Sequence, residues 1–188
     1  MNRVITYQGI RDCFENANSL YTSAQKIADA DKRYGTANSL LVLSGEECVK
    51  GYVLLAVYFD IQLEFEIEPY FRKHSTKHIT GKEVIGMTKV TSLLITAFAK
   101  DRKSKLPNSI MDIADLFFGN DQEEKWWDSA DDQKKKGFYV DLINGKFSNP
   151  SCISLEMYQT SLRIISRYIR SLSVVESLKP DDYRLIPR

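Results

Sequence analysis

The stretch Thr36–Asp60, TANSLLVLSGEECVKGYVLLAVYFD, decides the fold. Wound as a helix, it carries apolar residues on most of its sides, and such a helix is buried by its neighbours all round. Its longest uninterrupted apolar run, Tyr52–Phe59, is far shorter than the ~20 residues that a membrane span needs. The stretch therefore predicts the central helix of a soluble helical bundle, with no membrane partner.

Two amphipathic helices are predicted from stripes of apolar residues that recur at steps of four and three. The stripe before the central helix consists of Ile10, Phe14, Ala17, Tyr21, Ala24 and Ala28. The stripe near the end of the chain consists of Leu155, Tyr158, Leu162, Ile165, Ile169 and Leu172. Ser154 is the predicted N-cap of this last helix, and Glu156 lies in its first turn, where a negative charge is favourable.

Breaks between the helices are predicted from glycine, proline and capping residues. Gly35 suits the C-terminal cap of the first helix, and Thr36 suits the N-cap of the second. A third helical region begins after Pro69, has a predicted break near Thr80 and runs to Lys100. These boundaries give four helices, which we expect to pack antiparallel.

About fifty residues between the third and fourth helices do not read as one long helix. The segment NSIMDIADLFFG reads as a short helix capped by Asn108 or Ser109, and the next segment is charged, with a Trp pair that we expect to anchor it. Asn144-Gly145 is a favoured two-residue hairpin turn between β-prone residues. Tyr139 and Asp141 would share one strand face; either Tyr139 packs against the body, which we favour, or the hairpin forms a wall over a polar site.

The sequence thus predicts an all-α four-helix bundle with an irregular insertion before the last helix. We expect a single domain over residues 1–188, with the insertion at approximately 104–153 and a C-terminal tail at approximately 179–188. The 188 residues are 43% hydrophobic and 27% charged, which is ordinary for a globular protein. Cys13, Cys48 and Cys152 are scattered, which argues against a disulfide framework or a zinc site and for packing roles in a reducing cytoplasm.

Charge is unevenly distributed although the formal net charge is only +1. Lys and Arg far outnumber acids from Phe71 to Lys105, and acids far outnumber Lys and Arg from Asp112 to Asp132. Such asymmetry can mark an anion-binding face, or the two blocks can neutralise each other. Both interpretations are open at this point.

Glu46, Glu47 and Lys50 interrupt the apolar central helix. Lys50 lies four residues after Glu46 and three after Glu47, so it can pair with either on one helical face. Because an unpaired buried charge is very costly, these carboxylates need partners. The residues form either an internal salt bridge or a support for basic catalytic groups from another helix.

The segment FRKHSTKH, Phe71–His78, supplies such basic groups and holds both histidines of the chain. In a helix, His74 shares a face with Lys77 and with His78. Histidine exchanges protons near neutral pH, and Arg72 and Lys77 can hold phosphate oxygens. Together they are suited to RNA cleavage without a metal, with His as base toward the ribose 2′-hydroxyl. The alternative is a solvated basic helix end.

Three ordered segments resemble a known family. The start of the AbiV-type abortive-infection proteins is similar to the segment NANSLYTSAQKIADADKRYGTANSLLVLSGEECVKGYVLL. Their Phe-Arg-x-His-x-x-Lys stretch is similar to FRKHSTK, and their Gly-aromatic-Tyr-Val-Asp segment is similar to KGFYVDLINGKFSNP. The resemblance spans approximately Phe14 to Arg170. This family belongs to the HEPN superfamily of helical bundles, many of which are metal-independent ribonucleases in phage defence and toxin–antitoxin systems.

The resemblance implies a cytoplasmic antiphage protein, a homodimer whose active sites form where subunits pair, with no cofactor and no metal. The implied motif residues are Glu46, Glu47, Lys50, Arg72, His74 and Lys77. The family pattern selects His74, whereas the general HEPN spacing from Arg72 selects His78. The generic HEPN Arg-His motif opens the last helix of the bundle, and here it precedes the insertion. The rival interpretation is therefore a non-catalytic protein that binds a phage or host protein through its basic face; a nucleotide-binding domain is a third, although no glycine-rich phosphate loop supports it.

Overall fold

The computed structural model describes residues 3–58, 121–143 and 145–176. Its helices are α1 (Arg3–Asp31), α2 (Tyr34–Tyr58), α6 (Asp121–Phe138) and α7 (Leu155–Glu176), and its strands are β1 (Asp141–Ile143) and β2 (Lys146–Ser148). A short 3₁₀ turn, η1 (Pro150–Cys152), joins β2 to α7. The predicted third helix and the short helix at Asn108 lie outside the described residues.

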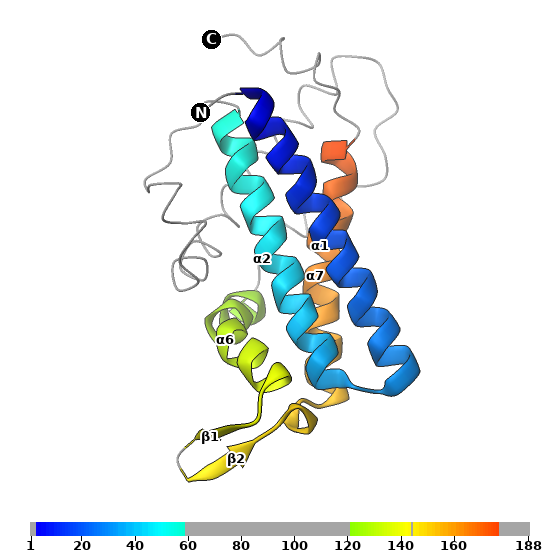
Figure 1. Cartoon of the computed structure of the whole chain (residues 1–188), viewed down its shortest axis with the longest axis vertical. Coiled ribbons are helices and arrows are strands. Elements are labelled where there is room, and N and C mark those ends of the chain that lie inside the picture. Colours follow the sequence, from blue (N-terminus) through cyan, green and yellow to red (C-terminus); the bar gives the residue numbers. More distant parts are fainter. Residues whose placement is uncertain (1–2, 59–120, 144, 177–188) are drawn as a thin grey trace.

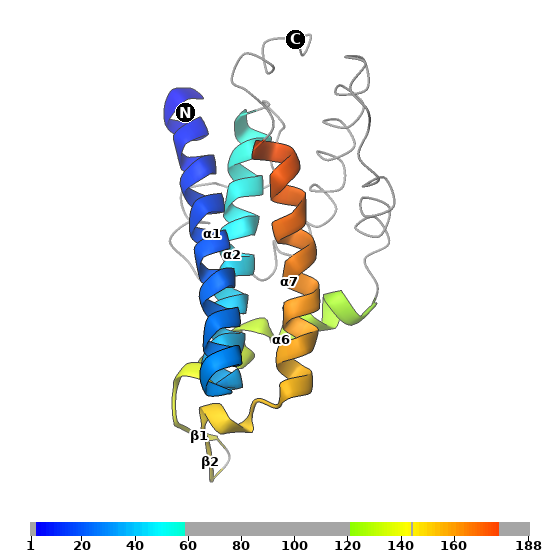
Figure 2. The same cartoon turned by 90° about the vertical axis from the view of Figure 1, so that its right-hand side faces the viewer.

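Three long helices run side by side along the molecule (Figures 1 and 2). The helices α1 and α2 pack against each other along most of their length, and α7 lies alongside both. The helix α6 crosses α2 obliquely near the end of the bundle from which the hairpin projects. The predicted all-α bundle is thereby confirmed. None of the described helices is both long enough and apolar enough to cross a bilayer.

The core is built around α2, as its apolar composition predicts. Among the most deeply buried side chains are those of Leu41, Val42, Val49, Val53 and Leu55 on α2. The predicted stripe of α1 faces them: Phe14 packs edge to face on Tyr52, with ring centroids 5.4 Å apart. Burying one such large apolar side chain is worth about 1.5–3 kcal/mol, so this shared face holds α1 and α2 together.

The connection between α1 and α2 differs from the prediction. The helix α1 ends at Asp31, and Lys32, with φ of 54°, adopts the left-handed conformation that ends many helices. The helix α2 already begins at Tyr34, so Gly35 and Thr36 lie inside it and the predicted caps at these two residues are wrong. Gly35 is needed for another reason: a Cβ there would lie 2.2 Å from the carbonyl oxygen of Pro150.

The charged segment after residue 120, which was expected to be irregular, forms the helix α6. The expected anchoring by its Trp pair is confirmed, because Trp126 and Trp127 are both buried. The Trp126 Nε1–H donates to Ser161 Oγ at 2.7 Å, and the Trp127 Nε1–H donates to the Tyr168 hydroxyl at 3.1 Å. Both acceptors lie on α7, so the indoles fasten α6 to the last helix.

The predicted hairpin is confirmed, with β1 and β2 antiparallel around Asn144-Gly145. The predicted N-cap of α7 is confirmed as well, since the Met157 N–H donates to Ser154 Oγ at 3.2 Å. The favoured packing of Tyr139 is wrong: its side chain is 64% exposed, just before β1. The hairpin extends beyond the end of the bundle instead of folding back over the described helices (Figure 1).

Candidate functional site: an ionic cluster between α2 and α6

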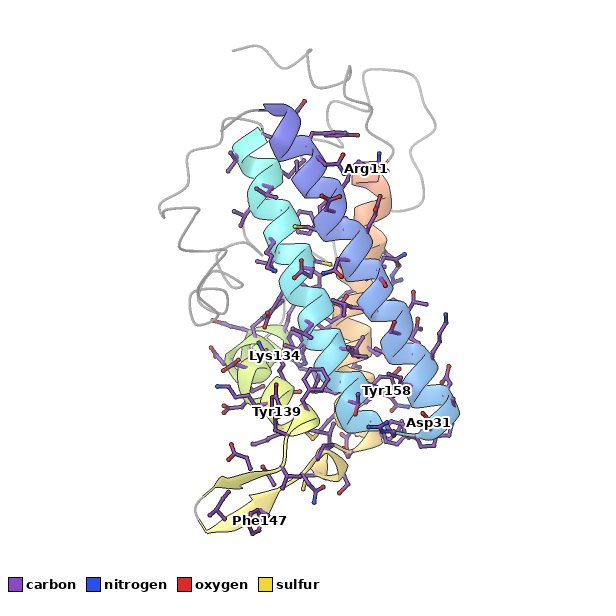
Figure 3. The ribbon with its side chains drawn as sticks, viewed as in Figure 1. Arg11, Asp31, Lys134, Tyr139, Phe147 and Tyr158 are labelled. Carbon is purple, nitrogen blue, oxygen red and sulfur yellow. The ribbon has the colours of Figure 1, made fainter. Side chains whose placement is uncertain are left out.

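Glu46 is the most buried charged side chain on α2, with 2% of its surface exposed. Lys134 of α6 meets it, with Nζ 2.6 Å from Glu46 Oε1, and lies beside α2 in Figure 3. Lys134 Nζ is also 3.3 Å from Asp131 Oδ1, and the other oxygen of Asp131 is 2.5 Å from Lys135 Nζ. These four residues, Glu46, Asp131, Lys134 and Lys135, form what we call the α2–α6 cluster.

Small residues let the two helices come close enough for this ion pair. Ser39 Oγ donates to the Lys134 carbonyl oxygen at 2.8 Å, and Asn38 Nδ2 donates to Gln133 Oε1 at 3.2 Å. Near the end of α6, a Cβ on Gly137 would lie 2.1 Å from Ser39 Oγ and 2.3 Å from the Gly35 carbonyl oxygen. Only glycine fits at residue 137 without moving backbone, so the approach of α6 to α2 depends on it.

Glu47 and Lys50 form a second ion pair on α2, three residues apart. Their side chains are only 17% and 16% exposed. The sequence allowed Lys50 to pair with either acid, and the structure pairs it with Glu47, whereas Glu46 takes its cation from α6. The internal salt bridge that the sequence allowed is therefore present, and a second, long-range pair stands beside it.

The cysteine thiol on α1 lies within the electrostatic reach of this second pair. Burial, and then the negative charge of Glu47, raises the pKa of Cys13 to about 11, while Lys50 opposes the shift. Burial also raises the pKa of Cys48, which is wholly inside the core. Both thiols therefore stay protonated and unreactive at neutral pH. Packing roles hold for these two, but Cys152 is exposed, so a packing role there is wrong.

Asp131 shows the effect of its two lysine partners. Burial favours the protonated carboxyl, but hydrogen bonds from Lys135 and Lys134 outweigh burial and lower the pKa of Asp131. The carboxylate is thus charged at neutral pH and leaves Lys134 bridging two anions. Cations and anions alternate through the α2–α6 cluster, which is the arrangement that a buried charge requires.

A further buried network, which the sequence pattern did not predict, lies between α6 and α7. Glu123 has a side chain that is 4% exposed; it accepts from Arg167 Nη2 at 2.7 Å and from the Tyr168 hydroxyl at 2.6 Å. Burial, followed by the charge of Glu123, raises the pKa of Tyr168 well above its ordinary value. Since Trp127 donates to the same hydroxyl, the network couples one end of α6 to α7.

A helical stripe could have revealed both networks. Glu123, Trp127, Ala130 and Lys134 recur at steps of four, three and four, so they share one face of α6. The stripe carries an acid at one end and a base at the other, which hides it from a purely apolar pattern. Helix α6 therefore turns two opposite charges inward, Glu123 toward α7 and Lys134 toward α2.

The six predicted motif residues divide into two groups of three. Glu46, Glu47 and Lys50 lie within two turns of α2, and each has an ion-pair partner. The other three, Arg72, His74 and Lys77, lie outside the described residues, as does the rival His78. Across residues 3–58, 121–143 and 145–176, no three His, Cys, Asp or Glu side chains gather as metal ligands.

The two acids of α2 are held in fixed ion pairs, Glu46 with Lys134 and Glu47 with Lys50. Glu46 Oε1 accepts a hydrogen bond from Lys134 Nζ at 2.6 Å, and this bond holds the carboxylate at a fixed place on α2. Chemically, the described part of the site offers carboxylates whose positions are fixed by lysines.

The family model of the HEPN-type AbiV proteins matches residues 6–170 of this chain. The match runs from the first turns of α1 through most of α7, and so includes the α2–α6 cluster and the hairpin. No curated protein and no solved structure matches the chain. Membership indicates a role in abortive-infection defence. Because the match covers most of its length, the chain belongs to the AbiV family of HEPN proteins.

Proposed function

We propose that this protein is an antiphage defence protein whose active form is a metal-independent endoribonuclease, working as a homodimer. The observation that carries the proposal is the Glu46–Lys134 pair. It holds a family-motif carboxylate, almost wholly buried, at a fixed place on α2. Such a carboxylate is suited to orient a basic catalytic residue contributed by another part of the chain.

In the proposed reaction His74 acts as the general base. It takes the proton of a ribose 2′-hydroxyl, and the 2′-oxygen then attacks the adjacent phosphorus while the bond from phosphorus to the 5′-oxygen breaks. Water protonates the departing 5′-oxygen, which leaves a 2′,3′-cyclic phosphate and a 5′-hydroxyl. Arg72 and Lys77 stabilise the pentacoordinate phosphate through charge-assisted hydrogen bonds. The positioning residues are Glu46, Glu47 and Lys50.

A second candidate is a non-catalytic defence protein that binds a phage or host protein through the basic face around Arg72. One observation favours it: Glu46 and Glu47 already have lysine partners, Lys134 and Lys50, and this suits a purely structural role. In that case the ion pairs maintain the fold, and the histidines are not needed for protection.

Phage plating separates the two candidates. Cells expressing the wild type, His74→Ala or His78→Ala would be challenged with phage, and protein abundance would be checked by immunoblot. The ribonuclease proposal expects His74→Ala to lose protection by at least about 100-fold, the scale of one general base. His78→Ala is the matched control and should protect like the wild type. Full protection by a well-expressed His74→Ala protein would favour the binding candidate instead.

A further inference from the structure

The β-hairpin exposes large apolar side chains to solvent. Leu142 and Phe147 face each other across the two strands, and they are 57% and 73% exposed. The two residues that lead into β1, Tyr139 and Val140, are 64% and 66% exposed. An isolated two-stranded hairpin is at best marginally stable in water, and contiguous exposed apolar groups commonly mark an interaction site. The hairpin therefore has the composition of a contact surface.

The base of the hairpin is held firmly by the bundle. On one side, Gly137 touches the backbone of Gly35 and the side chain of Ser39 at the start of α2. On the other side, Pro150 of η1 packs directly against Gly35. The Asn149 side chain accepts from the Ser151 N–H at 2.9 Å and so fixes the turn that follows β2. A hairpin clamped at both ends presents its free part in a defined direction, beyond the ends of α1 and α2 (Figure 1).

The two edges of the hairpin are not equivalent. Antiparallel pairs alternate between hydrogen-bonded and non-hydrogen-bonded, and the pair beside a two-residue turn, Ile143 with Lys146, is hydrogen-bonded. The next pair, Leu142 with Phe147, therefore directs its backbone N–H and C=O groups outward. On β1 the Leu142 N–H already donates to the Asp141 carboxylate at 2.8 Å. A carboxylate placed this way blocks strand addition at β1 and leaves β2 as the open edge.

We propose that the β2 edge pairs with β2 of a second copy of this chain, antiparallel, about a two-fold axis at Phe147. Each Phe147 would then exchange both backbone hydrogen bonds with its symmetry mate, and the two hairpins would form one four-stranded sheet. Leu142 and Phe147 of both copies would lie in one row on the same face of that sheet. Figure 3 shows Phe147 near the free end of the hairpin, away from the helices.

The sequence of β2 is compatible with pairing to a second copy of itself. A two-fold contact brings the same strand against itself, so its residues must tolerate the pairing that symmetry dictates. Here Lys146 comes opposite Ser148, so no like charges meet across the axis. A Phe side chain buries about 150–250 Å², whereas a standard interface buries about 800 Å² per partner. The hairpin contact is therefore one part of the interface, the part that sets its register.

This inference rests on the proposed homodimer but not on RNA cleavage. Cysteine cross-linking tests it in the full chain, in a Cys152→Ser background that removes the exposed thiol. In the proposed sheet the two copies of residue 147 have Cα atoms about 5.5 Å apart, within the ~4.4–6.8 Å that a disulfide spans. The two copies of residue 142 lie three strand spacings apart, roughly 14 Å, too far to link.

We expect Phe147→Cys to form a disulfide-linked dimer under mild oxidation at least about 10-fold faster than the matched control Leu142→Cys. Both changes replace an exposed apolar side chain on the same face of the hairpin, so collision alone gives both the same rate. Equal rates, or faster linkage through residue 142, would overturn the proposed pairing. Light scattering on the wild type identifies which claim has failed: a dimeric mass without linkage at residue 147 refutes the hairpin contact alone, and a monomeric mass refutes the homodimer with it.

Discussion

Replacing Lys134 by Met removes the cation that faces Glu46 and keeps most of the length and packing of the side chain. Glu46 is 2% exposed and its Oε1 lies 2.6 Å from Lys134 Nζ, so water cannot readily take the place of the ammonium group. Removing one partner of a buried ion pair costs about 3–5 kcal/mol. Because the Lys134 side chain is itself 11% exposed, we expect a loss at the lower end of this range, about 3 kcal/mol of unfolding free energy.

The change should be visible in unfolding by urea or by heat. For a chain of this length each kcal/mol lowers the melting temperature by about 2–4 °C, so we expect Lys134→Met to lower it by roughly 6–12 °C. Trp126 and Trp127 lie buried on the same helix, and their fluorescence reports the loss of α6 packing directly. Lys125→Met, an exposed change on α6, is the matched control and should alter stability by less than about 0.5 kcal/mol.

A double-mutant cycle with Glu46→Gln isolates the pair. If Glu46 and Lys134 stabilise the protein through each other, the cost of Lys134→Met should shrink by about 1–3 kcal/mol when Glu46 is already neutral. The reasoning is refuted if Lys134→Met is as stable as the Lys125→Met control, or if the two changes are simply additive.

Three further outcomes follow from the described contacts. At pH 7.5 iodoacetamide should modify Cys152 rapidly in the native protein and spare Cys13, whose pKa is raised to about 11. Equal labelling of Cys13 and Cys152 in mass spectrometry would contradict the placement of Cys13. Gly137→Ala should lower the melting temperature by more than 5 °C, because the new Cβ would lie 2.1 Å from Ser39 Oγ. An unchanged melting temperature would contradict the close packing of α6 against α2 at this residue. Asp131→Asn should be less stable than the wild type at pH 7. This difference in stability should disappear as pH falls below 3.8, because the lowered pKa of Asp131 stabilises the fold only while the carboxyl is ionised. A difference in stability that persists in acid would contradict the ion pairs.

Local pattern predicted most of the described fold. The stripes of α1 and α7, the buried α2, the Ser154 cap and the Asn144-Gly145 turn are all set by residues close together in sequence. Such features need no knowledge of the tertiary partner, which is why the sequence reveals them. One member of the α7 stripe was predicted wrongly, since Leu155 is 45% exposed. The caps placed at Gly35 and Thr36 failed because Gly35 serves a distant contact, with Pro150, that no local pattern shows.

Long-range electrostatics could not be predicted in the same way. The partner of Glu46 is 88 residues away on a helix whose inward face carries charge and whose composition is mostly polar and charged. Glu123 was missed for the same reason, since a buried carboxylate looks like any surface acid until Arg167 and Tyr168 are placed beside it. The motif on α2 was visible from the sequence because its charges interrupt an apolar run, but only the structure supplies Lys134.

We propose that His74 cleaves RNA without a metal, and the products of cleavage test this proposal most directly. Purified wild type, His74→Ala and His78→Ala proteins would be incubated with end-labelled RNA in EDTA, and the termini of the products identified. We expect the wild type and His78→Ala to generate 2′,3′-cyclic phosphate ends in the chelator and His74→Ala to generate none. Cleavage by His74→Ala at the wild-type rate, or no cleavage by a wild-type protein that protects cells from phage, would contradict it.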